Sequence, residues 1–148
     1  MPINFIKHAE KGNLFLKELA LELGDESNTP KAGRILQAVF KTLRNYLTLE
    51  ENFQLLSQLP MALKSIYING WRPFAKYEVS RKRSGFIEDV IASEGKNSWM
   101  DFSNLEDSEF AVNAVFKTMR KYVSEGEFKD IEAILPKQLK ALVRENAL

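Results

Sequence analysis

The segment Ala38-Val-Phe-Lys-Thr-Leu-Arg-Asn-Tyr-Leu47 recurs later in the same chain as Ala114-Val-Phe-Lys-Thr-Met-Arg-Lys-Tyr-Val123. Seven of the ten positions are identical, and the same offset of 76 residues (38 to 114) aligns Leu59-Pro60 with Leu135-Pro136. Self-similarity at a fixed offset is typical of an internally duplicated architecture. We therefore interpret the chain as two copies of one structural unit.

Local signals on both sides of the repeated segment indicate helices. Its apolar residues are spaced three and four apart, as on one face of an α-helix. In the first copy these residues are Leu36, Val39, Phe40, Leu43 and Leu47. A capping box follows in each copy, Thr48-x-x-Glu51 and then Ser124-x-x-Glu127, which predicts the start of the next helix. Each copy then reaches a proline, which can begin a further helix.

The N-terminal region predicts another helix that ends near residue 23. Its stripe consists of Phe5, Ala9, Gly12, Leu16, Leu19 and Leu23. Gly12 weakens a helix by about 1 kcal/mol relative to alanine, so one long helix or two pieces are both open. Gly24 is expected to end the helix. Thr29 is expected to cap the following helix, with Pro30 in its first turn.

The whole chain is therefore expected to be all-α, with two tandem pseudo-symmetric repeats of about four helices each packed into one helical bundle. Residues 15–24 also resemble residues 86–95 at an offset of 71 (15 to 86), which predicts a longer loop around residues 96–104. The predicted organisation is a single domain over 1–148, with repeat one at 1–67, a linker at 68–84 and repeat two at 85–148. The predicted core residues are Phe40, Leu43, Leu59, Leu63, Phe116, Met119, Leu135 and Leu139.

Composition narrows the classes of function. The 148 residues are 45% hydrophobic and carry a formal net charge of +1, so no strong overall field favours nucleic acid or an anionic membrane. Cysteine is absent and His8 is the single histidine, which argues against a transition-metal site. Neither a signal peptide nor a membrane-spanning stretch is recognisable. We expect a cytoplasmic protein with no cofactor and no membrane partner.

Two basic pairs recur at equivalent positions of the repeated helix: Lys41 with Arg44, and Lys117 with Arg120. One interpretation is a duplicated site for an anion. The favoured interpretation is structural, with each arginine paired to the capping-box glutamate that follows it, Glu51 or Glu127. Repeats preserve folding contacts as readily as they preserve sites.

The linker combines aromatic and basic residues and is the other candidate binding region. Its main candidates are Trp71, Arg72, Phe74 and Tyr77. Such a segment can bind single-stranded nucleic acid through stacking and phosphate contacts. The favoured interpretation is that the aromatic rings hold an irregular segment on the core, with Trp71 buried at the seam between the two copies.

The repeated helix, the Leu-Pro-x-x-Leu-Lys element and the motif Tyr67-x-x-Gly-Trp-x-Pro73 together resemble one bacterial family, the domain-of-unknown-function family numbered 2267. The similarity covers roughly residues 14–143. It implies two helical repeats, each with a Leu-Pro break, and a Gly-Trp-x-Pro linker after the first. It implies no particular activity.

The function we expect is that of a non-enzymatic helical interaction or scaffold module. A groove between the two halves would receive an apolar segment of an unidentified protein partner, such as an amphipathic helix. Three alternatives stay open: a small-ligand pocket between the repeats, a weak nucleic-acid binder that uses the linker, and an enzyme. The enzyme is the least favoured because the sequence shows no nucleophile–base constellation. The sequence also leaves a homo-oligomer open.

Overall fold

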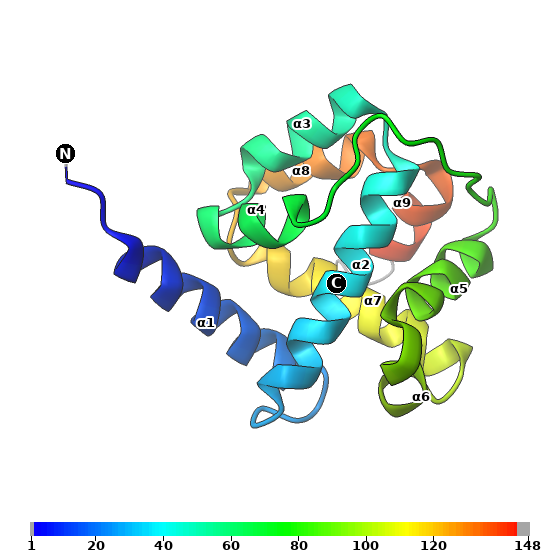
Figure 1. Ribbon diagram of the computed structural model, residues 1–148, viewed down its shortest axis with the longest axis horizontal. Helices are drawn as coiled ribbons and strands as arrows, with labels where there is room; N and C mark the ends of the chain where they lie inside the picture. The colour runs from blue at the N-terminus through cyan, green and yellow to red at the C-terminus, as the bar shows by residue number, and fades with distance from the viewer. Residues whose placement is uncertain (1, 145–148) are drawn as a thin grey trace.

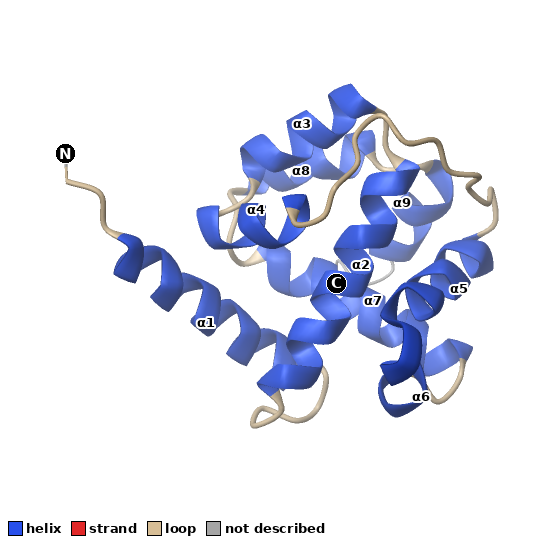
Figure 2. Cartoon of the chain, in the orientation of Figure 1, coloured by secondary structure: helices blue, strands red, loops and turns tan. Residues whose placement is uncertain are grey.

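The computed structural model of the protein describes residues 2–144, apart from the side chains at positions 97, 99 and 144. This part of the chain is helical and contains no strand (Figure 2). The helices are α1 (Phe5–Glu22), α2 (Thr29–Tyr46), α3 (Leu49–Gln58), α4 (Met61–Ile68), α5 (Arg83–Glu94), α6 (Ser98–Asp101), α7 (Leu105–Arg120), α8 (Glu125–Ile134) and α9 (Lys137–Arg144), with a short 3₁₀ helix at Gly95–Asn97. The all-α prediction is confirmed, and the helices pack into one bundle (Figure 1).

Helix α1 is one continuous helix whose first half extends beyond the bundle (Figure 1). The predicted apolar stripe is therefore correct for its second half, where Leu19 is buried, and wrong for Phe5, which is 77% exposed. Gly12 marks the crossing of α1 and α4, since a Cβ atom there would lie 2.8 Å from the Cβ of Ala62. Gly24 follows the helix with a φ of +93°, as expected of a glycine stop.

The caps of the next helices are mostly as predicted. Asn28, and not Thr29, caps α2, because the Asn28 side chain accepts a hydrogen bond from the backbone N–H of Lys31 at 3.2 Å. Asparagine is a better N-cap than threonine, and α2 therefore starts one residue earlier than predicted. Both predicted capping boxes, at Thr48 and at Ser124, are present.

Helix contacts come in matched pairs across the two halves. Helix α2 packs against α5, and α7 packs against α1, so the first helix of each half lies on the repeated helix of the other half. Helix α4 packs on α1 and α2 just as α9 packs on α5 and α7, while α3 lies against α8. This is the pattern expected of a pseudo-two-fold arrangement. Superposition of the halves, with Phe40 over Phe116 and Pro60 over Pro136, stays a prediction.

The core lies where the repeat predicts it. All eight predicted core residues are buried. Phe53 of α3 is different: it is 57% exposed, because Asn52 and Leu55 occupy the buried positions of that helix.

The predicted long loop at 96–104 instead contains the short helix α6. Asp101 at the end of α6 is buried and accepts two hydrogen bonds from Arg34 of α2, from Nε at 2.8 Å and from Nη2 at 2.9 Å. A paired arginine and carboxylate of this geometry are among the stronger polar contacts in proteins. This pair therefore fastens the insertion to the bundle.

The linker runs from residue 69 to residue 82, without helix or strand, between α4 and α5. Its end is tied down at Ser80. The Ser80 N–H donates to the Tyr46 hydroxyl at 3.3 Å, and the Ser80 carbonyl accepts from Nε2 of Gln138 at 2.8 Å. The linker is thus attached to one helix of each half. The outermost positions of the predicted 1–148 domain, residue 1 and residues 145–148, lie outside the described residues.

Candidate functional site: the linker surface and the α3–α8 cleft

Trp71 is partly buried at the start of the linker. Its ring meets Phe53 of α3 edge to face at a centroid distance of 5.9 Å, and Tyr67 of α4 at 6.4 Å. Both contacts lie within the first half, so Trp71 does not close a seam between the two halves as the sequence suggested. The reason is that the linker leaves α4 and first lies back against α3. The contacts support the interpretation that Trp71 holds the linker in place.

Arg44 holds the backbone in place where α4 ends and the linker begins. Its Nη1 atom donates to the backbone carbonyls of Tyr67 and Asn69, both at 2.8 Å. These carbonyls lie at the C-terminal end of α4, where backbone carbonyls have no hydrogen-bond donor within the helix. Glu51 instead accepts from the backbone N–H of Thr48 at 2.8 Å. The predicted ion pair between Arg44 and Glu51 is therefore absent from the described part of the chain.

A buried polar network lies behind Arg44, and the sequence reasoning missed it. The Asn52 amide nitrogen donates to the carbonyls of Arg44 at 3.0 Å, Leu47 at 3.2 Å and Thr48 at 3.0 Å. The Asn52 amide oxygen accepts from the hydroxyl of Tyr67. Burial raises the pKa of Tyr67 far above its ordinary value, so the phenol stays a proton donor.

A signal for this network exists in the repeat. The offset of 76 aligns Asn52 with Phe128 and Tyr67 with Val143. A polar residue in one copy where the other copy has a large apolar residue marks a position at which the interiors differ. Comparing the copies position by position would therefore have identified the network.

The other basic candidates have different surroundings in the two halves. Lys117 pairs with Glu22 of α1 at 3.2 Å, and the Arg120 guanidinium lies 4.9 Å from the centre of the Phe128 ring. Glu127 accepts from its own cap residue and not from Arg120. Lys41 is exposed on α2 and lines a small hollow of about 110 Å³. The four cations therefore do not form two equivalent groups.

Apolar side chains, most of them exposed, lie near Trp71 or follow it in the linker. We call this the linker surface: Leu49, Phe53, Trp71, Phe74 and Tyr77. Phe74 is 85% exposed and Tyr77 is 50% exposed. Trp71, Arg72, Tyr77 and Arg44 also border one small cavity of about 50 Å³. The structure thus brings Trp71, Arg72 and Tyr77 to one cavity, whereas Phe74 lies in the same segment with its ring exposed.

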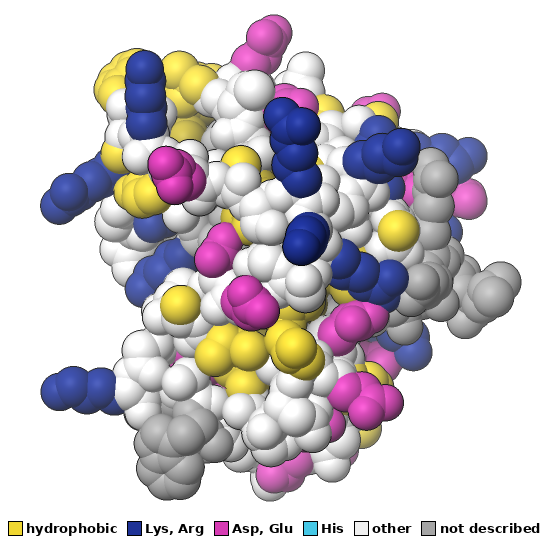
Figure 3. Space-filling model, turned by 90° about the vertical axis from the view of Figure 1, so that its right-hand side faces the viewer, with side chains coloured by type: hydrophobic (Ala, Val, Ile, Leu, Met, Phe, Trp, Pro, Cys, Tyr) yellow, Lys and Arg dark blue, Asp and Glu magenta, His cyan; other side chains and the backbone are white. Residues whose placement is uncertain are grey.

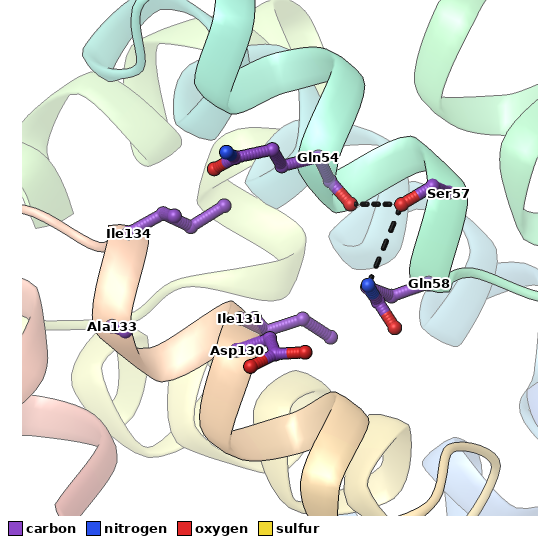
Figure 4. Close-up of a pocket in the computed structure, with 7 residues that line it drawn as sticks. All are labelled: Gln54, Ser57, Gln58, Asp130, Ile131, Ala133 and Ile134. Atoms are coloured by element: carbon purple, nitrogen blue, oxygen red, sulfur yellow. Dashed lines mark hydrogen bonds between the residues drawn. The ribbon is translucent and has the colours of Figure 1, made fainter.

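A second candidate lies between the two halves, in the cleft of about 290 Å³ that separates α3 from α8 (Figure 4). Gln54, Ser57 and Gln58 line it from α3. Asp130, Ile131, Ala133 and Ile134 line it from α8. Figure 4 shows the Gln54 side chain extending toward Ile134, with Gln58 on the side of Asp130 and Ile131. The lining is therefore polar on one wall and mainly apolar on the other.

The described residues also bear on two other kinds of function, metal binding and membrane spanning. No group of three or more His, Cys, Asp or Glu side chains among them is placed to hold a metal ion. No helix within the described ranges has the length and apolar character that crossing a bilayer requires.

An all-helical bundle with matched halves and an irregular Gly-Trp-x-Pro linker defines a recognisable class. The family model described as an uncharacterized conserved protein (DUF2267) matches residues 12–142. The chain belongs to this family. The match begins at Gly12, where α1 meets α4 and leaves the bundle. No curated protein matches the chain.

Proposed function

We propose that the protein is a non-catalytic helical interaction module, and that its linker surface docks an acidic, apolar segment of a partner protein. The observation that carries this proposal is the exposure of aromatic rings around an anchored tryptophan. Phe74, Tyr77 and Phe53 are 85%, 50% and 57% exposed, respectively. Contiguous exposed apolar side chains of this kind mark interaction sites in soluble proteins.

The chemistry of the surface supports a protein partner. Aromatic residues and arginine are enriched at protein–protein interfaces, and tryptophan, tyrosine and arginine supply most of their hot spots. Arg72 and Lys76 are exposed within the same segment. Figure 3, which views the side that carries α5 and α6, shows most of the basic side chains of this face over its upper part, with some acidic ones among them, and mainly acidic side chains over its lower part. Acidic side chains of a partner would complement the basic part and speed the encounter.

The backbone of the surface is held before any partner arrives. Arg44 binds two carbonyls at its start, and Ser80 is bound by Tyr46 and Gln138 at its end. A preorganised surface loses less conformational entropy on binding. The rings are therefore presented on a fixed support.

The α3–α8 cleft is the groove between the halves that the sequence led us to expect as the docking site. Its lining favours an apolar helix less than the linker surface does, because Gln54, Ser57, Gln58 and Asp130 contribute polar groups. We therefore assign docking to the linker surface.

The test is affinity capture from cell extract by the wild-type protein and by two matched variants. Phe74→Ala removes the most exposed ring of the linker surface. Phe110→Ala removes a ring that is 58% exposed on α7. We expect a specific protein to be lost with Phe74→Ala and retained with Phe110→Ala, and its capture to weaken as salt is raised.

Two outcomes would contradict the proposal. One is a captured partner that both variants retain equally. The other is tighter binding of a fluorescent single-stranded oligothymidine than of any protein, with its loss in Phe74→Ala. The second result would assign the linker surface to nucleic acid.

A further inference from the structure

The two contact seams between the halves, α2 with α5 and α7 with α1, share one arrangement. Tyr46 meets Phe86 edge to face at 5.0 Å, and Tyr122 meets Phe15 edge to face at 5.1 Å. A carboxylate accompanies each tyrosine. The Tyr46 hydroxyl donates a hydrogen bond to Asp89 at 2.6 Å. The pKa of Tyr46 is raised to about 12, mainly by burial and secondly by the hydrogen bond to Asp89.

In the second seam, the pKa of Tyr122 is raised to about 12, mainly by burial and secondly by the neighbouring Glu18 carboxylate. Glu18 and Asp89 are matched by the offset of 71. Each seam therefore pairs a partly buried tyrosine with a carboxylate of the helix that crosses from the other half.

The seams differ in how they balance negative charge. In the α7–α1 seam, Glu22 lies between two ammonium groups, with Lys117 at 3.2 Å and Lys121 at 3.1 Å. At the matched positions of the α2–α5 seam, Asn45 stands for Lys121 and Ser93 stands for Glu22. Glu22 and one of its two lysines are therefore replaced by shorter uncharged residues in the other seam, whereas the second lysine, Lys117, is matched by Lys41.

A hollow of about 310 Å³ occupies the place of that missing ion pair. Asn45, Tyr46, Asp89 and Ser93 line it from α2 and α5, and the linker residues Tyr77 and Glu78 cover it. Its lining residues include two carboxylates and no lysine or arginine, and neither Glu78 nor Asp89 forms an ion pair within the described part of the chain. The volume falls at the lower end of the range for small-molecule sites.

We infer that this hollow binds a small organic cation that carries an ammonium group. The ammonium occupies the place that the Lys121 side chain takes in the other seam and donates hydrogen bonds to Asp89 and Glu78. The carbon part of the ligand lies against the rings of Tyr46 and Tyr77, which offer apolar contact area beside the carboxylates. Tyr77 borders both this hollow and the linker surface, but ligand binding in the hollow does not depend on the proposed partner protein.

The experiment is a titration of the ¹⁵N-labelled protein with benzylammonium chloride, followed by amide shifts in two-dimensional NMR. Benzyl alcohol is the matched uncharged probe, because it has the same ring and nearly the same size. We expect saturable shifts at Asn45, Ala92 and Ser93 with the ammonium and none with the alcohol. Equal shifts with both probes, or no saturable shift with either, would overturn the inference.

Three variants locate the site. Glu78→Gln removes a carboxylate from the exposed cover, and it should weaken benzylammonium binding about tenfold. Glu88→Gln removes an exposed carboxylate of α5 outside the hollow and should leave the dissociation constant within about twofold. The double variant Asn45→Lys with Ser93→Glu rebuilds the ion pair of the other seam and should abolish binding.

Circular dichroism shows whether the double variant is folded. If it is not, the comparison of Glu78→Gln with Glu88→Gln decides alone. Retained binding in a folded double variant, or equal effects of the two single variants, would show that the probe sits elsewhere.

Discussion

The two halves show matched helix contacts around different interiors. In the first half, Arg44, Asn52 and Tyr67 form a polar network that reaches the backbone of the linker. In the second half, the matched positions hold Arg120 and Phe128, with the arginine stacked over the ring. The polar interior occurs in the half whose last helix leads into the linker. The matched helix contacts therefore tolerate either interior, and the polar one serves to hold an irregular segment in place.

This comparison explains why the first half keeps a buried asparagine. A satisfied polar network fixes one arrangement of its members, whereas an unpaired buried group is costly. Asn52 satisfies three carbonyls at the turn between α2 and α3 and also accepts from Tyr67. The position of α4, and with it the start of the linker, is thereby specified.

The largest effect is expected where the halves agree. Phe40→Ala and Phe116→Ala should each lower the free energy of unfolding by about 3–5 kcal/mol, because both rings are fully enclosed. Urea titration measures the loss, with Phe110→Ala as the exposed control. A loss below about 1 kcal/mol for either ring would show that its helix face is assigned wrongly.

The polar network gives the next effect, and it should be confined to the first half. Tyr67→Phe leaves the amide oxygen of Asn52 without its donor in a buried site, which should cost about 1–3 kcal/mol. Tyr77→Phe, at an exposed tyrosine, should change stability by no more than about 0.5 kcal/mol. A double-mutant cycle with Asn52→Ala measures the coupling between Asn52 and Tyr67. Additive losses would mean that the two residues act independently.

Substitutions at Trp71 and Phe74 distinguish a ring that anchors the linker from a ring that is exposed for binding. Trp71→Ala removes two edge-to-face ring contacts and should cost about 1–3 kcal/mol. Phe74→Ala, at a ring that is 85% exposed, should cost less than about 0.5 kcal/mol. Thermal unfolding compares the two. In a Trp99→Phe background, full access of a quencher to Trp71 together with unchanged melting of Trp71→Ala would reject the anchoring role.

The smallest effect is pH-dependent and belongs to the α7–α1 seam. Burial works against ionisation of Glu22, but hydrogen bonds and charge from Lys121 and Lys117 keep the pKa of Glu22 below its ordinary value. A carboxyl with a lowered folded-state pKa stabilises the fold above its unfolded-state pKa, and this contribution is lost as the pH falls through the folded-state value. Both lysines are about half exposed to solvent, so the contribution should be under about 1 kcal/mol. Glu22→Gln should flatten the acid limb of the stability curve, whereas Glu26→Gln, at an exposed carboxyl of the following turn, should leave that limb steep.

The sequence predicts those parts of the molecule that depend on neighbours along the chain. Helical spacing and the capping boxes at Thr48 and Ser124 involve residues three or four apart, so they can be read directly. Asn28 and Thr29 are adjacent and both suit the N-cap position. Only the backbone geometry of the folded chain shows that Asn28 caps α2. The pairing of Arg34 with Asp101 joins residues 67 positions apart, and nothing in the local pattern indicates it. The linker candidates were recognised by composition, but their support by Arg44 required the tertiary structure.

The crossed packing of the first helices has a consequence for the order in which the protein can be completed. The chain is made from its N-terminus, so α1 and α2 leave the ribosome before α5 and α7 have been synthesised. Tyr46 on α2 cannot meet Phe86 until α5 has emerged, and Phe15 on α1 cannot meet Tyr122 until nearly the whole chain has emerged. The first half must therefore wait with part of its apolar surface uncovered, and the second half closes both seams as it arrives.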